Sequence, residues 1–177
     1  MRIDTIEEFK IDQSLRQSVS QLIKSAFEGY PDEMTYYNQV PDFRILVWDG
    51  DQLIGHSGIH HRRICVDKMH RLSVFGIADL CIHPQRQLKN VGSEILKHVT
   101  DLAEKNEVDF LILASGAEEF YLKNDFFTVH NPCRWLVIHN HESMGVFRRT
   151  LPSGLLVKST SEVEWPSGEV DFMGHMM

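Results

Sequence analysis

The chain has 177 residues, 42% hydrophobic and 24% charged, with a formal net charge of −7 at pH 7. This composition is typical of one globular domain with its own core, so we expect a single domain over residues 1–177. The acidic balance argues against nucleic acid as a partner and suits a cationic small molecule. No apolar run reaches the roughly 20 residues that span a bilayer, and the start lacks a signal peptide's apolar core. We therefore expect no membrane partner and a cytoplasmic location.

The first half of the chain is predicted to form a helix followed by antiparallel strands. Apolar residues recur at helical spacing over residues 14–27, and Asp12 or Ser14 can cap the start. A polar, tyrosine-rich loop follows over residues 28–43. Strand patterns then cover three ranges, and Asp49-Gly50 marks a tight turn after the first of them. These ranges are 44–48, 53–66 and 72–82. Because the antiparallel strands come first, the chain does not start as a dinucleotide-binding fold, in which helices alternate with strands.

The second half is predicted to contain a longer helix, a parallel strand and further short elements. Residues 91–105 carry the apolar stripe of an amphipathic helix. Residues 108–114 are predicted to form a short apolar strand. We expect this strand to be parallel to residues 72–82, since a helix crosses between the two. A short helix over residues 117–124 and strands over 126–130 and 134–139 follow. Residues 140–177 hold several glycines and prolines. We expect them to be an extended or weakly structured C-terminal extension.

The most informative segment is the turn between Ile82 and Ser93. It joins a strand to a helix start, where free backbone N–H groups and the helix dipole bind anions. Arg86 and Lys89 add positive charge, and no acidic residue lies between Pro84 and Ser93. The turn lacks both the G-x-G-x-x-G and the P-loop motifs, but it contains Gln87-x-x-Asn90-x-Gly92. The segment therefore predicts a pyrophosphate site of another kind.

This turn resembles the acyl-CoA loop of the GNAT acyltransferases, Q/R-x-x-G-x-G/A, with Asn90 where glycine is usual. Asparagine tolerates a left-handed backbone, so we expect the turn to survive. Residues 117–126 are similar to the family's A-x-x-F-Y-x-K-x-G-F, with Asp125 in place of glycine. The resemblance covers about residues 14–139. It implies the α/β GNAT fold, with a mixed, mostly antiparallel sheet, a splayed parallel strand pair and flanking helices.

The resemblance also implies acetyl-CoA as the cosubstrate. In this family the strand before the turn binds the pantetheine arm and the thioester through its backbone, and the turn binds the phosphates. The cofactor-binding residues implied here are Leu80, Cys81, Ile82, Gln87, Leu88, Lys89, Asn90, Val91, Gly92 and Ser93.

His130-x-x-Cys133 fits no standard zinc spacing, so we expect no metal.

Tyr121 and Asp79 are the predicted catalytic residues. Tyr121 occupies the position of the family's tyrosine, which donates a proton or a hydrogen bond to the CoA sulfur; packing on the sheet is the alternative. Asp79 lies among apolar strand residues, where burial would raise its pKa and let it accept a proton from the incoming ammonium. The alternatives are a structural aspartate, and proton transfer through water without a dedicated base.

The acceptor side is predicted to hold carboxylates among aromatic residues. Asp32 and Glu33 lie in the tyrosine-rich loop, and Asp171 lies in the C-terminal extension, which we expect to wall the acceptor site. Such groups would bind a cationic amine by charge and stacking. The tail around Trp165-x-x-Gly168 also resembles aminoglycoside 2′-N-acetyltransferases and nodulation N-acyltransferases.

Together these features predict an acetyl-CoA-dependent N-acetyltransferase. Its acceptor would be a primary amine of a small molecule, such as an amino sugar or aminoglycoside, which attacks the thioester directly through a tetrahedral intermediate. The alternative is a non-catalytic acyl-CoA-binding or regulatory module that keeps the fold. Asn90 and Asp125, both at glycine positions, are the features that favour this alternative. A homodimer is left open.

Overall fold

The computed structural model describes residues 1–31, 34–87, 90–139 and 142–176. The chain forms two compact units. The first unit contains Met1–His60 and Ile77–Val99, and the second contains His61–Gly76 and Thr100–Met177. Two long strands, β3 (Gln52–Val66) and β4 (His70–Ile82), contribute residues to both units.

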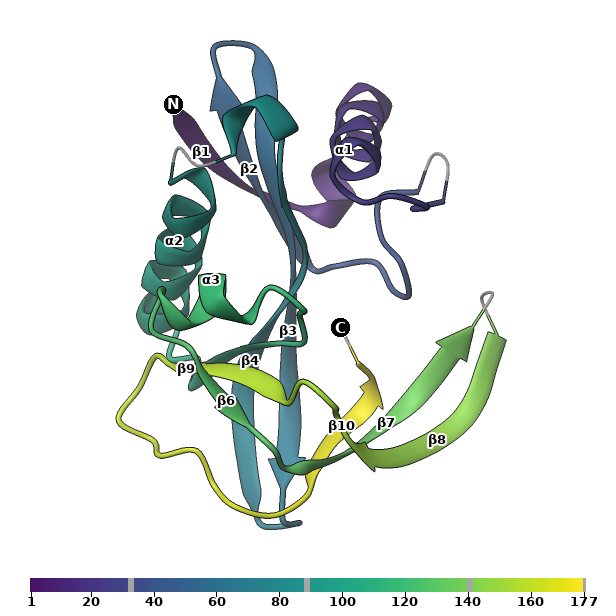
Figure 1. The fold of residues 1–177 in the computed structure, drawn as a ribbon, viewed down its shortest axis with the longest axis vertical. Helices are drawn as coiled ribbons and strands as arrows, with labels where there is room; N and C mark the ends of the chain where they lie inside the picture. The colour runs from purple at the N-terminus through teal and green to yellow at the C-terminus, as the bar shows by residue number, and fades with distance from the viewer. Residues whose placement is uncertain (32–33, 88–89, 140–141, 177) are drawn as a thin grey trace. The chain divides into compact units, whose positions relative to one another are not determined.

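In the first unit, an antiparallel sheet lies between two helices (Figure 1). β1 (Arg2–Glu7) pairs with β2 (Phe43–Asp49), and β2 pairs with β3. A 3-10 turn, η1 (Glu8–Lys10), leads to α1 (Gln13–Ala26), and a second one, η2 (Pro84–Arg86), precedes α2 (Val91–Lys105). The predicted strands at 44–48, 53–66 and 72–82 are confirmed. β1 was not predicted.

The helix α1 forms where the apolar spacing predicts it. Asp12 caps its start, since the Asp12 carboxylate accepts a hydrogen bond of 2.8 Å from the Leu15 N–H. The helix buries Val19, Leu22 and Ile23. They pack in a cluster with Leu46, Leu53 and Cys81 of the sheet. The helix therefore covers the sheet beside the last residues of β4.

The described strands belong to one mixed sheet, whose main path has the order β6-β9-β5-β4-β3-β10-β7-β8, while β2 pairs with β3 and β1 off this path. The second unit contains the later strands. Its elements follow each other along the chain as β5 (Phe110–Leu113), α3 (Glu118–Leu122), β6 (Phe127–Val129), β7 (Pro132–His139), β8 (Glu142–Thr150), β9 (Leu155–Ser159) and β10 (Val170–His175). β5 is parallel to β4, with Val74 opposite Phe110 and Gly76 opposite Ile112. The predicted parallel pair is thereby confirmed, and its described pairing ends at Gly76.

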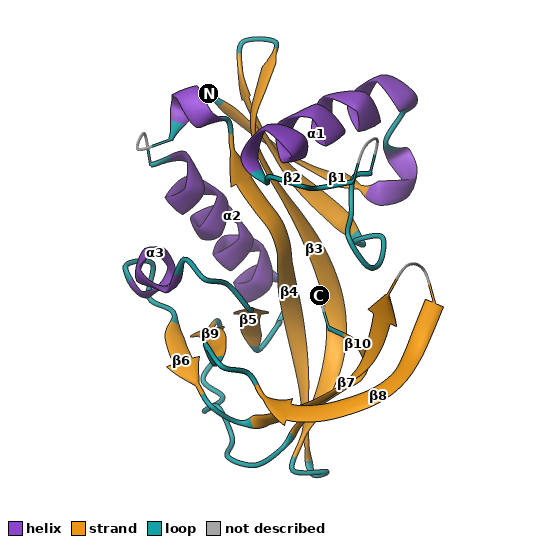
Figure 2. Cartoon of the chain, turned by 45° about the vertical axis from the view of Figure 1, so that its right-hand side comes forward, coloured by secondary structure: helices purple, strands orange, loops and turns teal. Residues whose placement is uncertain are grey.

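The expectation of a weakly structured C-terminal extension is wrong. The extension contributes three strands, drawn in orange in Figure 2. β9 lies between β5 and β6 and pairs antiparallel with both, whereas β10 joins β3 and β7. Val170 and Phe172 of β10 are fully buried. Several of the prolines and glycines that suggested a weakly structured segment lie between these strands, as at Pro152 and Gly154, because they form connections there, whereas Gly174 lies within β10.

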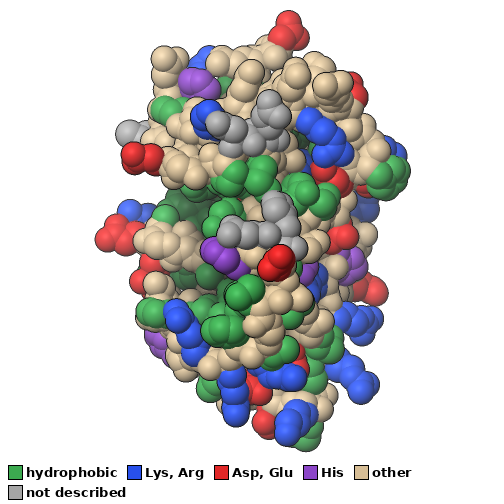
Figure 3. All heavy atoms as spheres, turned by 90° about the vertical axis from the view of Figure 1, so that its right-hand side faces the viewer, with side chains coloured by type: hydrophobic (Ala, Val, Ile, Leu, Met, Phe, Trp, Pro, Cys, Tyr) green, Lys and Arg blue, Asp and Glu red, His purple; other side chains and the backbone are tan. Residues whose placement is uncertain are grey.

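The edge strand β8 differs from the other strands in its exposure, because all of its residues are exposed. Met144, Val146 and Phe147 are large apolar residues among them. Figure 3 faces the side on which Figure 1 draws the β7–β8 hairpin and shows hydrophobic and basic side chains next to each other. Over the described ranges, every helix is too short or too polar to span a bilayer.

Candidate functional site

β4 departs from regular strand geometry at Asp79, whose φ of 48° lies in the left-handed region. The carbonyl of Asp79 lies 3.1 Å from His56 Nδ1, and the carbonyl of Ala78 accepts a 3.3 Å bond from the Ser57 hydroxyl. A left-handed residue cannot continue the regular pairing of a strand, so the φ of Asp79 indicates a bulge, whose carbonyls bond to side chains of β3. This bulge comes directly before residues 80–82, the predicted thioester-binding backbone.

The Asp79 carboxylate is partly buried and hydrogen-bonded. The Tyr30 hydroxyl donates to Asp79 Oδ2 at 3.0 Å. Burial raises the pKa of Asp79, while the Tyr30 hydrogen bond and the Arg44 charge act against that rise. Burial and the Asp79 charge also raise the pKa of Tyr30, so the phenol stays protonated and is the donor. A carboxyl of raised pKa is what a proton acceptor for an ammonium needs. The base role nevertheless stays a prediction, since a structural aspartate has the same contacts.

Behind the bulge lies a polar network that the sequence reasoning missed. Arg44 of β2 is only 1% exposed, and its Nε donates to Glu8 Oε2 at 2.5 Å. Its Nη1 lies 2.7 Å from the Thr35 carbonyl and 2.9 Å from His56 Nε2. Burial, and then the Arg44 charge, lower the pKa of His56 to about 3. The sequence did contain a signal for this network, because an arginine and a histidine, Arg44 and His56, lie in otherwise apolar strand patterns.

The predicted phosphate turn has the conformation that its motif requires at Asn90. Asn90 has a φ of 59°, so the expectation that asparagine takes the left-handed conformation at this glycine position is confirmed. α2 begins at Val91, and the Glu94 N–H donates to the Asn90 carbonyl at 3.0 Å. Gly92 is buried, and Gln87 is exposed. Leu88 and Lys89 lie outside the described residues, so their predicted contacts stay predictions.

Arg86, predicted to add positive charge to this turn, forms an ion pair with Asp49. Arg86 Nη2 lies 2.6 Å from Asp49 Oδ2. Asp49 lies at the end of β2, on the hairpin that leads into β3. The pair partly neutralises the Arg86 charge and links η2 to the β2–β3 hairpin. An incoming phosphate would therefore compete with Asp49 for this guanidinium.

Tyr121 lies on α3 in the second unit and is 6% exposed. Its ring packs edge-on against Phe120 and Phe126, with ring centroids 5.0 and 5.5 Å away. Burial raises the pKa of Tyr121 to about 12, and a hydrogen bond with Ser115 acts against this rise. The phenol is therefore protonated at neutral pH and able to donate. Asp125, the second departure from glycine, has a φ of 66° and so also takes the left-handed conformation.

The predicted acceptor-side residues are only partly described. Asp32 and Glu33 lie outside the described residues. Asp171 lies on β10, where Oδ2 accepts from Arg134 at 2.5 Å and Oδ1 accepts from the Met173 N–H at 2.8 Å. Both carboxylate oxygens are therefore engaged within the second unit. A cationic acceptor would have to compete with Arg134 for this carboxylate.

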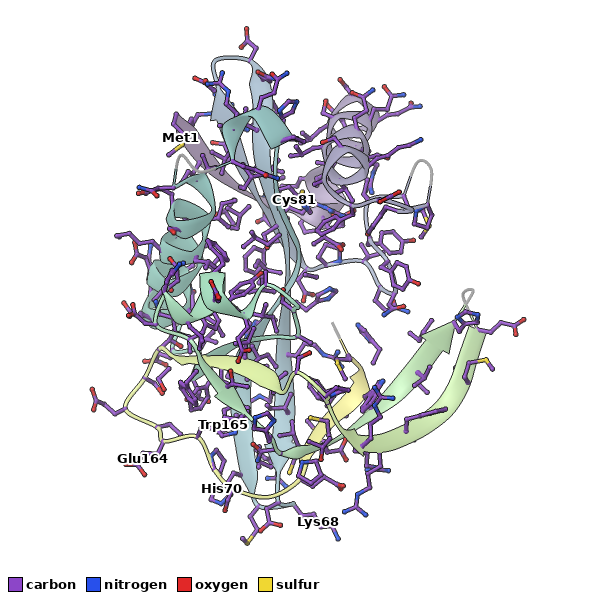
Figure 4. The ribbon with its side chains drawn as sticks, in the orientation of Figure 1. Met1, Lys68, His70, Cys81, Glu164 and Trp165 are labelled. Atoms are coloured by element: carbon purple, nitrogen blue, oxygen red, sulfur yellow. The ribbon has the colours of Figure 1, made fainter. Side chains whose placement is uncertain are left out.

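The tail motif around Trp165 has a structural role in the second unit. The Trp165 indole, labelled in Figure 4, donates to Asn131 Oδ1 at 3.0 Å and packs edge-on against Phe110 at 5.0 Å. Asn131 Nδ2 in turn donates to the Gly168 carbonyl at 2.6 Å. These contacts fix the connection between β9 and β10 against the core. The W-x-x-G string is thus explained by packing, and its link to an acceptor site stays a prediction.

Comparisons with known proteins agree with this architecture. The model of the acetyltransferase (GNAT) domain matches residues 9–129. The CoA complex of the GNAT family N-acetyltransferase YhbS from Escherichia coli has 14% sequence identity and a TM-score of 0.65, over 97% of this chain and 90% of that one. ElaA from Escherichia coli has 13% identity and a TM-score of 0.61, over 90% and 100% of the two chains. No curated protein matches the chain.

A further similar structure is a GCN5-related N-acetyltransferase from Anabaena variabilis, at 15% identity and a TM-score of 0.62. The match covers 75% of this chain but only 34% of that one, so this chain spans about a third of its length. At such identities the structures support the fold alone. They give no support to the finer resemblance to the aminoglycoside and nodulation enzymes. The family match extends over about two thirds of the sequence and confirms both the predicted fold class and the predicted enzyme class. The chain belongs to the GNAT acetyltransferase family, and it is an acyltransferase.

Proposed function

We propose that residues 1–177 act as one domain that transfers the acetyl group of acetyl-CoA to a primary amine of a small molecule. The observation that carries the proposal is the segment from β4 to α2. There a bulge at Asp79 precedes residues 80–82, and Asn90 takes the left-handed conformation at the start of α2. The similar structures of YhbS and of a Brucella melitensis GNAT protein hold CoA and acetyl-CoA, respectively. Acetyl-CoA is therefore the cosubstrate that we assign to this turn.

In the proposed reaction, the ammonium of the acceptor first loses a proton, and Asp79 is the group in the first unit suited to take it. The amine nitrogen attacks the thioester carbonyl carbon, and the backbone of residues 80–82 stabilises the oxyanion. The carbon–sulfur bond then breaks. Tyr121 donates a hydrogen bond to the leaving thiolate, and the nitrogen releases its second proton to water; if Tyr121 instead gives its proton to the thiolate, its phenolate takes up that second proton.

For the acceptor we propose a cationic, ring-shaped amine, such as an amino sugar or aminoglycoside. The Asp79 carboxylate is bonded to Tyr30, whose ring centroid lies 6.1 Å from that of Phe27 and 6.2 Å from that of Tyr37. Tyr37 is 63% exposed, so this aromatic cluster reaches the surface. A carboxyl beside accessible aromatic faces favours a cation that can stack. Asp32, Glu33 and Asp171 are proposed as further contacts.

The test is a thiol-release assay with acetyl-CoA and a panel of amines: aminoglycosides, free amino sugars, polyamines and amino acid amides. We expect CoA release to exceed hydrolysis with at least one amino sugar or aminoglycoside and to fall in a Tyr121→Phe variant. Release with a polyamine only would refute the proposed acceptor class but not the activity. Binding of acetyl-CoA without release for any amine would favour the non-catalytic module. Absence of binding at millimolar acetyl-CoA would refute both.

A further inference from the structure

We propose that His56 is a positioning residue for acetyl transfer, whose ring, oriented by Arg44, holds the Asp79 carbonyl and so fixes the β4 bulge. The inference rests on the proposed function for its kinetic test, but it extends that function to residues outside both family motifs. Glu8, Arg44 and His56 come from η1, β2 and β3. Their contacts form a chain that ends at the backbone of β4.

The contact with Arg44 determines where the His56 proton lies. A guanidinium can only donate hydrogen bonds, so His56 Nε2, 2.9 Å from Arg44 Nη1, must accept with its lone pair. The ring is then neutral and carries its proton on Nδ1. His56 Nδ1 therefore donates to the Asp79 carbonyl, 3.1 Å away. A fully buried imidazole beside a fixed positive charge is expected to be neutral for the same reason.

Arg44 is itself held in place from three directions. Glu8 accepts from its Nε at 2.5 Å, and the Thr35 carbonyl and hydroxyl accept from Nη1 and Nη2 at 2.7 and 3.2 Å. The other oxygen of Glu8 accepts from Arg16 of α1 at 2.7 Å. Because a buried guanidinium is costly without its partners, Arg44 cannot turn away from His56 without breaking several bonds. The orientation of the His56 ring is thus set by a rigid group.

The Asp79 contact matters because the bulge is an unfavourable backbone conformation. A left-handed residue inside a strand interrupts the regular pairing of β4, so contacts that hold this residue favour the bulge over a regular strand. Here His56 holds the Asp79 carbonyl, and Tyr30 holds its carboxylate. Of the remaining charged groups of this network, Glu8 bonds to Arg44, and Arg16 bonds to Glu8.

The anchored carbonyl also determines where the next N–H points. The Asp79 carbonyl and the Leu80 N–H belong to one planar trans peptide, in which the two groups point in opposite directions. Because the carbonyl points to the His56 ring, the Leu80 N–H points away from that ring. Leu80 is the first of the residues proposed to bind the thioester. Without the His56 bond this peptide is free to rotate, and a donor aimed at the developing oxyanion would be lost.

Two variants of His56 separate the positioning role from a packing role. In His56→Asn the amide nitrogen replaces Nδ1, so the donor to Asp79 remains and the contact with Arg44 is lost. In His56→Gln the amide group replaces Nε2, so the contact with Arg44 remains and the donor to Asp79 is lost. We expect His56→Gln to lower kcat about 10- to 100-fold, approaching the loss of one oxyanion donor. His56→Asn should stay within about threefold of wild type, and the KM for acetyl-CoA should change little in both, since most of the cofactor contacts remain.

Thermal unfolding of both variants controls for loss of the fold. Equal kcat losses in two folded variants would mean that the contact with Arg44, or the packing of the ring, is what counts, and would overturn the proposal. An unchanged kcat in His56→Gln would overturn it as well.

A second measurement does not depend on activity. In wild type with ¹⁵N-labelled histidine, long-range ¹H–¹⁵N spectra at pH 7 should show a neutral His56 ring protonated at Nδ1. In uniformly ¹⁵N-labelled protein, the Leu80 amide signal should move in His56→Gln and stay near its place in His56→Asn. A ring protonated at Nε2, or at both nitrogens, would refute the inference. If wild type accepts no amine, the proposed function fails, whereas these spectra still decide whether His56 holds the bulge.

Discussion

Acid should destabilise this protein partly through His56, and the structure gives the size of the effect. The pKa of His56 is lowered from 6.5 to about 3 in the folded chain, because the ring is buried beside Arg44. In the unfolded chain the imidazole takes up a proton below about pH 6.5. In the folded chain it stays neutral down to about pH 3. The stability that this neutral ring contributes is therefore present above about pH 6.5 and is lost as the pH falls toward 3. Between pH 7 and pH 5 the loss amounts to about 2 kcal/mol.

The measurement is urea unfolding, followed by tryptophan fluorescence, of wild type and His56→Asn at pH 7 and pH 5. The free energy of unfolding of wild type should fall by about 2 kcal/mol more than that of the variant, which lacks the titrating ring. The same neighbours, Tyr30, Asp79, Arg44 and Glu8, surround this position in both proteins, so the difference between them reports mainly on the His56 ring. The raised pKa of Asp79 acts in the opposite direction, since stability is gained as that partly buried carboxylate takes up its proton. If the two proteins lose the same stability, His56 is not a buried neutral ring and the reasoning fails.

Three further substitutions test other parts of the molecule. Tyr121→Phe should lower kcat by about 10²-fold with a nearly unchanged melting temperature, since only the hydroxyl is removed; an unchanged kcat would leave Tyr121 a packing residue. Asn90→Gly should bind acetyl-CoA as well as wild type or better in calorimetry, because glycine takes the left-handed conformation at no cost and adds no side chain near the phosphates; weaker binding would mean that the asparagine side chain contributes a contact. Phe172→Ala should cost about 3–5 kcal/mol in urea unfolding, because the ring is fully buried in the second unit; a loss below about 1 kcal/mol would show that β10 adds little to the core.

The burial of β10 also changes what a truncation can show. Deletion of the chain after Glu164 removes a strand that pairs with both β3 and β7 and takes Phe172 out of the core. We expect the shortened protein to unfold or aggregate rather than to remain folded with a raised KM for the amine. Single substitutions such as Asp171→Asn are therefore the sharper test of the acceptor side. A raised KM for the amine in that folded variant would support the predicted contact.

The sequence by itself determined the features that depend on neighbours along the chain. α1 and α2 lie where the apolar spacing predicts them, and Asp12 caps α1 as proposed. The parallel placement of β4 and β5 followed from the helix between them. The left-handed turn at Asn90 could be predicted as well, because backbone preference is a property of the residue itself. Short motifs of this kind also carried the family resemblance.

Only the tertiary structure decided which distant residues meet. Arg44 reaches Glu8 across 36 residues, His56 reaches Asp79 across 23, and Arg134 reaches Asp171 across 37. The strands β9 and β10 likewise pair with strands that are remote in the sequence, so no local pattern distinguished them from loops. A buried polar group is stable only when a partner satisfies it. That partner is chosen by the fold and not by the spacing of residues, which is why neither the support behind the bulge nor the role of the tail could be foreseen from the chain alone.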